Sequence, residues 1–421
     1  MMRALFAGVS GLRNHLTRMD VIGNNIANVN TVAFKSSRVT FKEAFCQLVS
    51  GAARPSATLG GTNPIQIGTG VNIGSIDQMF SQGSLESTGQ PLDLAIQGDA
   101  FFVLNNGQAS VFSRAGNLQL DANGNLINPG TGYRVQGINA DDRGNFSSGT
   151  AITNVHIGLT DKAPAQATTK IALTGNLDAT AKVGDLKSMT TTTYDSAGAP
   201  HVLTLTFTNT GPTTWDWAAS VGGTPPTATV TPPGSGTVSF GPTGQLTGFT
   251  NPGGGTAITV SPASGGLPFD ITVDPGAVNT TSGLAGFANP SNAVVRDQNG
   301  FPSGSLVNIS VDANGVISGF FDNGVTRSLA QIALATFNNP GGLVRSNDGM
   351  YQSTPNSGLA ITGFAGGTSR SSITPGALEG SNVDISSEFT NMIITQRGFQ
   401  ANAKVVTTAD EILNDLVNLR R

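Results

Sequence analysis

Side chains suited to metal binding or nucleophilic attack are few in this sequence and far apart. The three histidines are His15, His156 and His201, and none lies near another histidine or near a cysteine. The chain contains no H-E-x-x-H or C-x-x-C metal motif, no G-x-x-x-x-G-K-[ST] phosphate loop and no nucleophile elbow between a strand and a helix. We therefore expect no enzymatic activity and no catalytic, metal-binding or cofactor-binding residues.

Two other chemically notable features have simple explanations. Cys46 is the only cysteine, so an intramolecular disulfide is impossible, and its apolar neighbours Phe45 and Leu48 indicate a small buried side chain rather than a reactive thiol. Trp215 and Trp217 alternate in T-W-D-W, which places both on one face of a strand, where they most simply join a core. The alternative for this pair is an exposed platform for a carbohydrate or a protein partner.

Four asparagine side chains are concentrated in one stretch, VIGNNIANVNTVAFK (residues 21–35). Asparagine is a mediocre helix former and a poor core residue, so four of them at a helix end need an explanation. Asn24 and Asn28 share one helix face, with Asn25 displaced from it, and Asn30 fits a helix stop. One alternative is a solvated helix end with a cap. We interpret the cluster as a junction between subunits, because an amide donates and accepts hydrogen bonds at once.

The elements that position these amides are two terminal helices with apolar seams. In both, apolar residues recur in alternating steps of four and three, the heptad pattern of helices that pack side by side. The N-terminal seam consists of Leu5, Val9, Leu12, Leu16, Met19, Gly23 and Ile26. The C-terminal seam consists of Ile385, Phe389, Met392, Gln396, Phe399, Ala403, Val406, Asp410, Leu413 and Val417, with Leu416 beside it. We expect these helices to pair with each other and with neighbouring copies, and Ser381 to open the second helix with a capping box.

Between the helices the apolar period becomes alternating, which is typical of strands. The sequence D-A-N-G occurs at residues 121–124 and 312–315, each time beside alternating apolar residues, and predicts two hairpins. The segment between them has its own composition, because residues 189–295 contain no Lys or Arg. We therefore predict one β domain interrupted by another.

Composition and charge exclude several classes of protein. Charged residues make up 11% of the 421 residues, and the net charge of −4 argues against binding to nucleic acid. The exception is a basic group near the N-terminus, which we expect to form a solvated face: Arg3, Arg13, Arg18, Lys35, Arg38 and Lys42. The alternative is a complementary contact with acidic residues of neighbouring chains, namely Asp410, Glu411 and Asp415.

The sequence also argues against a membrane-spanning protein or a cleaved secretion signal. No apolar run approaches the roughly 18 residues of a membrane span. Arg13, Asn14 and His15 interrupt the first apolar residues early, and no small-residue cleavage site follows. If the protein leaves the cell, we expect export without a cleaved signal peptide.

Several stretches resemble the flagellar axial proteins, a family of rod, hook and hook-associated subunits. DVIGNNIANVNTVAFK (residues 20–35) and FKEAF (residues 41–45) resemble the N-terminal signature of that family, and residues 377–419 resemble its C-terminal signature. Residues 81–104 and 112–128 resemble the first β domain shared by hook and distal rod proteins. The chain is therefore identified as a member of the axial family.

Within this family, the length of the chain and its insert favour the hook branch over the shorter distal rod branch. Residues 190–207, TTTYDSAGAPHVLTLTF, are similar to the opening of the outer domain of the hook branch. Residues 46–70 are instead more like the extended segment of distal rod proteins, which is associated with a stiff tube. A distal-rod-like subunit and a secreted β-rich adhesin or glycan-binding protein are the alternatives.

The expected fold is mixed and mainly β, with long N- and C-terminal α-helices forming a coiled-coil-like domain and two nested, discontinuous β domains. The expected boundaries are 1–30 and 380–421 for the helical inner-tube domain, 31–70 and 365–379 for connecting segments, 71–146 and 291–364 for the first β domain, and 147–290 for the inserted outer β domain.

The resemblance implies a structural subunit that assembles with itself into a flexible extracellular tube, coupling the rod to the filament and transmitting torque. The implied partners are other copies of the chain, the distal rod protein, the hook cap protein, the hook–filament junction proteins and the flagellar export apparatus. The expected contact residues are the two seams without Asp410, together with Asn24, Asn25, Asn28, Phe34 and Leu416.

Overall fold

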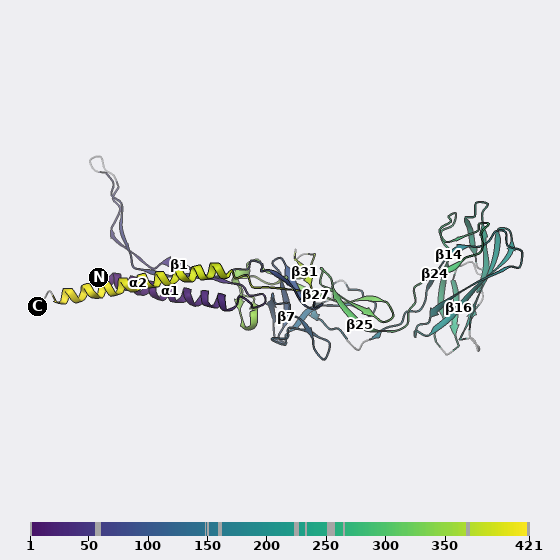
Figure 1. Ribbon diagram of the computed structural model, residues 1–421, viewed down its shortest axis with the longest axis horizontal. Helices are drawn as coiled ribbons and strands as arrows, with labels where there is room; N and C mark the ends of the chain where they lie inside the picture. The colour runs from purple at the N-terminus through teal and green to yellow at the C-terminus, as the bar shows by residue number, and fades with distance from the viewer. Residues whose placement is uncertain are drawn as a thin grey trace. The chain divides into compact units, whose positions relative to one another are not determined.

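The computed structural model describes residues 2–54, 60–147, 149, 151–158, 162–222, 227–231, 234–250, 257–263, 266–367 and 371–418. Within these ranges the chain is mainly β, with one long helix near each end (Figure 1), as the sequence predicted. α1 comprises Met2–Ala27 and α2 comprises Ile385–Asn418. The chain divides into two compact units, of which the first is Met1–Gly158, Ile309–Ser318 and Ser328–Arg421 and the second is Leu159–Asn308 and Gly319–Arg327.

The strands of the first unit lie between its two helices in the sequence. They are β1 (Ser37–Glu43), β2 (Cys46–Ser50), β3 (Ile65–Gly68), β4 (Val71–Gln78), β5 (Leu85–Ser87), β6 (Leu94–Gln97), β7 (Phe101–Asn105), β8 (Ser110–Ser113), β9 (Gln119–Leu120), β10 (Leu126–Ile127), β11 (Arg134–Asn139), β12 (Thr153–Asn154), β28 (Val344–Arg345), β29 (Met350–Gln352), β30 (Ile361–Phe364), β31 (Ser372–Pro375) and β32 (Ala377–Glu379). Three more strands continue along the chain from one unit into the other: β25 (Gly304–Val311), β26 (Val316–Phe321) and β27 (Thr326–Thr336).

The core of the first unit lies on a sheet in which β27, β11, β7, β8, β29 and β28 are neighbours in that order. β7 and β8 pair antiparallel, with Val103 opposite Phe112. Aromatic side chains fill the centre of this core. The rings of Phe112 and Phe337 pack edge to face, with their centroids 4.8 Å apart. Two further antiparallel pairs, β31 with β6 and β32 with β5, fasten the segment before α2 to this domain.

Both D-A-N-G segments form tight turns, which confirms the hairpin prediction. Asp121 Oδ1 accepts hydrogen bonds from the backbone N–H of residues 123 and 125, and Asp312 Oδ1 does so from residues 314 and 316. Gly124 and Gly315 have φ values of 80° and 74°, a left-handed conformation that glycine adopts without steric cost. The two turns lie in the same unit although the inserted segment separates them in the sequence.

The second unit is a β structure with one core. Its strands are β13 (Lys162–Ala163), β14 (Lys170–Asn176), β15 (Leu186–Tyr194), β16 (Pro200–Gly211), β17 (Thr214–Val221), β18 (Ala228–Thr231), β19 (Ser235–Phe240), β20 (Leu246–Thr250), β21 (Ala257–Pro262), β22 (Phe269–Asp274), β23 (Leu284–Ala285) and β24 (Val294–Gln298). Trp215 and Trp217 are both buried in this core, and Trp217 stacks on Phe249. The core explanation is therefore confirmed, and the exposed binding platform is wrong.

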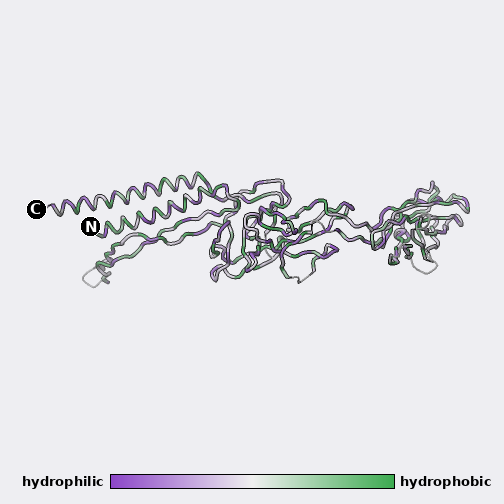
Figure 2. Tube along the Cα trace, turned by 90° about the horizontal axis from the view of Figure 1, so that it is seen from below, coloured by the Kyte–Doolittle hydropathy of each residue, from purple (hydrophilic) through white to green (hydrophobic). Residues whose placement is uncertain are grey.

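A two-stranded ribbon of β2 and β3 extends from the region of β1 and β4 and stands clear of the helix pair (Figure 1 and Figure 2). Every residue of these two strands is exposed. Cys46 lies on β2 and is exposed as well, so the expected burial of its thiol is wrong. The physical reason is that the ribbon has no covering layer within the described residues, so its apolar side chains have nothing to pack against.

The start of α2 also differs from the expectation. Asp384 Oδ1 accepts hydrogen bonds from Ser386 N at 2.9 Å and from Ser387 N at 3.3 Å. Ser381 Oγ instead accepts from Val383 N, one turn too early. Asp384 is thus the N-terminal cap, and the capping box expected from Ser381 is wrong.

Candidate assembly interface

α1 and α2 run antiparallel and approach closely through small residues. Gly8 lies against Val406, and Gly11 lies against Asn402. A Cβ atom added at Gly8 would come within 2.9 Å of Val406 Cγ2, and one added at Gly11 within 2.7 Å of Asn402 Cγ. Side chains at these two positions would require the helices to move apart or the facing side chains to shift, because protein interiors are close-packed.

The apolar seams lie mostly beside this contact and not within it. The buried residues of α1 are Gly8, Gly11, Ile22 and Asn25, each one position before a seam residue. On α2, Thr395 and Ala409 are buried, again one position before a seam residue. One residue turns a helix by about 100°, so both seams are rotated away from the partner helix. The expectation that the seams join the two helices is therefore wrong in its choice of face, with Val406 as the exception.

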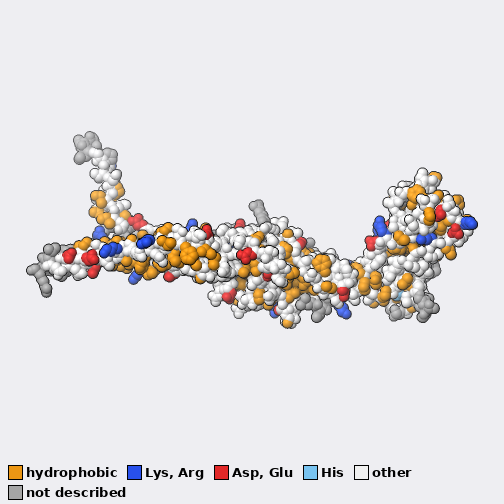
Figure 3. All heavy atoms as spheres, viewed as in Figure 1, with side chains coloured by type: hydrophobic (Ala, Val, Ile, Leu, Met, Phe, Trp, Pro, Cys, Tyr) orange, Lys and Arg blue, Asp and Glu red, His pale blue; other side chains and the backbone are white. Residues whose placement is uncertain are grey.

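The rotated seams leave apolar surface uncovered along the helix pair (Figure 3). The exposed apolar members are Val9, Leu16, Ile385 and Phe389, with exposures of 38% at Val9 and 50% at Phe389, and the polar members Gln396 and Asp410 are exposed as well. The half-buried members are Leu5, Leu12, Met19, Gly23, Ile26, Met392, Phe399, Ala403, Val406 and Leu413. Phe6, Ile393 and Ile394 add exposures of 67%, 58% and 55%. An apolar stripe of this kind is typical of a protein–protein contact surface.

Two of the expected contact residues are already used within the chain. Asn25 is 1% exposed; its Nδ2 donates to Ser37 O at 2.8 Å and its Oδ1 accepts from Ser37 N at 3.0 Å. Phe34 is 3% exposed and lies under the guanidinium of Arg345. Neither side chain is presented to a neighbour, which corrects the expectation for both. The side chains of Leu416 and Val417 lie outside the described residues.

The other asparagines form a local cap at the end of α1. Asn28 Nδ2 donates to Asn24 O at 2.9 Å, and Thr31 Oγ1 donates to Asn28 Oδ1 at 3.0 Å. Asn24 and Asn30 are exposed, and Asn28 is half-buried. The cap explanation thus accounts for Asn28, while Asn24 and Asn30 keep free surface for a contact with another chain.

A buried ion network joins the two segments that lead into the helices. Lys35 Nζ lies 2.7 Å from Glu379 Oε1 and also donates to Ser81 O at 2.8 Å. Gly83 N donates to the same carboxylate at 2.9 Å, and Arg114 Nη1 approaches its other oxygen at 3.5 Å. Burial lowers the pKa of Lys35, and the hydrogen bond and charge of Glu379 oppose that shift. The network fixes the distance between the two helix-bearing segments.

Sequence reasoning missed this network. Lys35 was expected on a solvated basic face, and the structure shows its side chain 0% exposed, so that expectation is wrong. A signal was present: Lys35 and Glu379 are single charges inside otherwise apolar or small stretches, and such residues are rarely buried unless paired. The partner itself could not be identified from local sequence.

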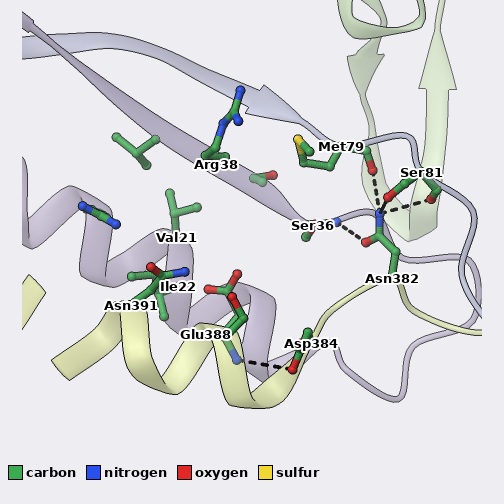
Figure 4. Close-up of a pocket in the computed structure, with 14 residues that line it drawn as sticks. Val21, Ile22, Ser36, Arg38, Met79, Ser81, Asn382, Asp384, Glu388 and Asn391 are labelled. Atoms are coloured by element: carbon green, nitrogen blue, oxygen red, sulfur yellow. Dashed lines mark hydrogen bonds between the residues drawn. The ribbon is translucent and has the colours of Figure 1, made fainter. Parts of the chain in front are cut away.

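A pocket of about 280 Å³ lies between α1, β1 and the start of α2 (Figure 4). Asn382 closes one side, since its Nδ2 donates to Met79 O at 2.7 Å and its Oδ1 accepts from Ser36 N at 2.8 Å. Glu388 enters from α2; burial raises the pKa of this carboxyl, and hydrogen bonding to Asn25 and the charge of Arg18 partly oppose the rise.

A histidine–carboxylate pair is buried in the second unit. His201 Nε2 lies 3.3 Å from Asp195 Oδ2, and both side chains are 3% exposed. Burial raises the pKa of Asp195, but hydrogen bonds from Ala199 N, His201 and Ala197 N together outweigh it and leave the pKa below its usual range. Sequence reasoning sought only histidine and cysteine neighbours for His201 and missed this acid six positions earlier.

In the part of the chain that the structure describes, no three His, Cys, Asp or Glu side chains come together as a metal site. Neither described helix has the length and apolarity needed to cross a bilayer.

Four family models match successive parts of the chain. They are described as Flagella basal body rod protein (residues 5–35), Flagellar hook protein FlgE/F/G D1 domain (95–176), Flagellar basal body protein FlaE D2 domain (165–301) and Flagellar basal body rod FlgEFG protein C-terminal (374–419).

Relatives match over the full length. The chain is 39% identical to the flagellar hook protein FlgE of Treponema pallidum over 463 aligned residues, covering 100% of both chains, and 34% identical to that of Escherichia coli, covering 99% of this chain and 100% of the other. It is 30% identical to the flagellar basal-body rod protein FlgG of Bacillus subtilis, covering 100% of both. A crystal structure of Helicobacter pylori flagellar hook protein FlgE2 matches 68% of this chain and 98% of that chain, with 16% identity and a TM-score of 0.48.

Proposed function

The chain belongs to the flagellar hook protein family, and on this premise we propose how its helix pair builds the contacts of a hook tube. The protein is a structural subunit of the bacterial flagellar hook and not an enzyme. It assembles with copies of itself into a flexible helical tube that couples the rod to the filament and transmits motor torque. The terminal helices form the coiled-coil-like inner tube, and the two nested β domains form its outer layers.

The observation that carries this proposal is the pair of apolar seams turned away from the intramolecular contact. The helices hold each other through Gly8 and Gly11, so their larger apolar residues remain available. Burying such surface contributes roughly 25 cal/mol per Å², which favours association between copies. The contact residues are Leu5, Val9, Leu12, Leu16, Met19, Gly23, Asn24, Ile26, Asn28, Ile385, Phe389, Met392, Gln396, Phe399, Ala403, Val406, Leu413 and Val417, with Leu416 beside the seam.

The inserted unit allows the tube to bend. Residues 189–295 contain no Lys or Arg, so ion pairs that fix a single register between copies are scarce there. Small polar contacts can slide past one another as the tube rotates. The exposed β2–β3 ribbon, within residues 46–70, limits this bending and stiffens the tube.

The remaining partners follow from the place of a hook in the flagellum. The subunit leaves the cell through the flagellar export apparatus without a cleaved signal peptide, and functions outside the cell. It contacts the distal rod protein at one end, the hook cap protein during growth, and the hook–filament junction proteins at the other end.

Two alternatives are less well supported. Identities of up to 39% to hook proteins, against 30% to the rod protein of Bacillus subtilis, favour the hook over the rod. The adhesin alternative depended on an exposed tryptophan pair, and both side chains are buried.

Removal of residues 1–28 tests the proposal. The truncated chain lacks α1 and its seam, and we expect it to remain a soluble, folded β protein that does not polymerise. A matched variant, Leu16→Ser with Phe389→Ser, keeps the chain length and removes two exposed apolar side chains. Tubes formed by the truncated chain, observed by electron microscopy, would contradict the proposed function.

A further inference from the structure

Three polar side chains lead from the core of the second unit to its surface. Asp195 lies in the turn between β15 and β16, His201 near the start of β16 (Figure 1), and Thr227 directly before β18. Asp195 and His201 are buried, whereas Thr227 is exposed. His201 Nε2 lies 3.3 Å from Asp195 Oδ2, and His201 Nδ1 lies 3.2 Å from Thr227 Oγ1. We call these three residues the Thr227 relay, because the imidazole connects a buried carboxylate to an exposed hydroxyl.

Backbone hydrogen bonds hold both ends of the relay. Asp195 Oδ1 accepts from Ala197 N and Ala199 N, each at 2.9 Å, so the carboxylate is fixed with its other oxygen toward the histidine. Thr227 O accepts from Ala263 N at 3.0 Å, which ties the start of β18 to the residue that follows β21. The three side chains are therefore positioned before any reaction, and such positioning lowers the entropic part of a reaction barrier.

The charge of Asp195 determines the tautomer of His201. Burial raises the pKa of this carboxyl, but its hydrogen bonds outweigh burial and keep the pKa below the usual range, so the group is ionised at neutral pH. An ionised carboxylate only accepts hydrogen bonds, so in the neutral imidazole Nε2 carries the proton and Nδ1 is the free base. Nδ1 therefore accepts from the hydroxyl of Thr227. The carbonyl oxygen of Gly222 lies farther from that hydroxyl, at 3.4 Å.

A hydroxyl in this environment is a better nucleophile than that of an ordinary threonine. A base within hydrogen-bond reach removes the hydroxyl proton as the oxygen attacks, and a third group orients the base. In the relay, His201 is the base, and Asp195 both orients the imidazole and stabilises the imidazolium that forms. The nucleophile is also the one member of the relay that lies exposed, so a reagent in solution can reach it.

We propose that Thr227 is a site of covalent modification, where its hydroxyl accepts an acyl group from an activated ester. Thr227 Oγ1 attacks the carbonyl carbon of the ester, a new C–O bond forms, and the bond from that carbon to the leaving group breaks. The hydroxyl proton passes to His201 Nδ1 and then to the leaving group. The step modifies the chain once and is not an enzymatic turnover. It goes beyond the proposed function, and its test does not depend on tube assembly.

Acetylation of the full chain with p-nitrophenyl acetate tests this proposal. The folded protein is incubated with the reagent at neutral pH and digested, and the acetylated peptides are quantified over time by mass spectrometry. Hydroxylamine distinguishes acetyl esters, which it cleaves, from acetylated lysines, which it leaves intact. We expect Thr227 to react roughly a hundredfold faster than Thr213, an exposed threonine of the same unit, because a positioned base contributes at least about that factor.

Substitutions separate the roles within the relay. Thr227→Ser keeps a hydroxyl and should still be acetylated at that position, whereas Thr227→Val should not. His201→Gln removes the base and should lower the rate at Thr227 to that of Thr213. Both tryptophans of the chain lie in this unit, so tryptophan fluorescence verifies that each variant remains folded there.

A measurement on the unfolded chain needs no substitution. Denaturant separates the three side chains, so Thr227 should then react no faster than Thr213. The inference is overturned if the two threonines react at equal rates in the folded protein, or if folded His201→Gln leaves the rate at Thr227 unchanged. Either result would show that the relay links strands without activating the hydroxyl.

Discussion

Lys35 and Glu379 are 344 positions apart in the sequence, yet Lys35 Nζ lies 2.7 Å from Glu379 Oε1 and neither side chain is exposed to solvent. The pair joins the segment that leaves α1 to the segment that enters α2. The helix pair is therefore held at its base by a charge contact inside the β unit, and at its middle by close glycine contacts.

Lys35→Met should destabilise the first unit strongly. The substitution leaves the buried carboxylate of Glu379 without its closest cation, and breaking one partner of a buried pair costs about 3–5 kcal/mol. The loss is measured as the free energy of unfolding from denaturant titration followed by circular dichroism. The control is Arg38→Met, because Arg38 and Asp77 form an exposed pair at 3.9 Å that contributes under about 1 kcal/mol. Equal losses in the two variants would contradict the role of the buried pair.

Gly8→Ala combined with Gly11→Ala should weaken assembly. Both added methyl groups meet atoms of α2 closer than 3.0 Å, so the helices must separate or repack, at a cost of about 1–3 kcal/mol. The critical concentration for tube formation then rises. Gly51→Ala is the control, because an added Cβ there meets no atom of the chain within 4 Å and Gly51 is not among the proposed contact residues. A uniform effect of all three glycines would show that close approach is not the cause.

Glu388 makes the helix pair more stable in mild acid. Burial raises its pKa above the ordinary 4.5, so its contribution is fully present below that value and is lost as pH rises through the folded pKa. We expect the melting temperature of tubes, followed by helical circular dichroism, to fall between about pH 4.5 and neutrality, and Glu388→Gln to reduce that fall. Glu86→Gln removes an exposed carboxyl and should leave the profile unchanged. Identical profiles for Glu388→Gln and the unmodified chain would refute the assignment.

Asp195 gives the inserted unit the opposite pH dependence. Its folded pKa is depressed, so its contribution is present above the unfolded value, about 3.9, and is lost as pH falls through the folded pKa. Asp195→Asn should cost about 1–3 kcal/mol near neutrality, because the buried carboxylate accepts two backbone hydrogen bonds and contacts His201. Both tryptophans of the chain lie in this unit, so tryptophan fluorescence reports its unfolding selectively. Asp216→Asn, at an exposed site, is the control and should have little effect.

The sequence determined features that depend on neighbouring residues. Heptad spacing predicted the two helices, and the D-A-N-G segments predicted both turns, because a glycine with positive φ and an aspartate that binds its own backbone act within five residues. The signatures at the two ends also predicted the family correctly.

The tertiary structure decided which faces meet. The sequence pattern marks the most apolar stripe of each helix, but the closest contact between two helices requires small residues. α1 and α2 therefore meet through Gly8 and Gly11, and several seam side chains stay exposed. The burial of Lys35 and the exposure of Cys46 were decided in the same way. Each depends on whether a segment distant in the sequence covers the side chain in the folded protein. The neighbouring residues in the sequence do not indicate whether such a segment is present.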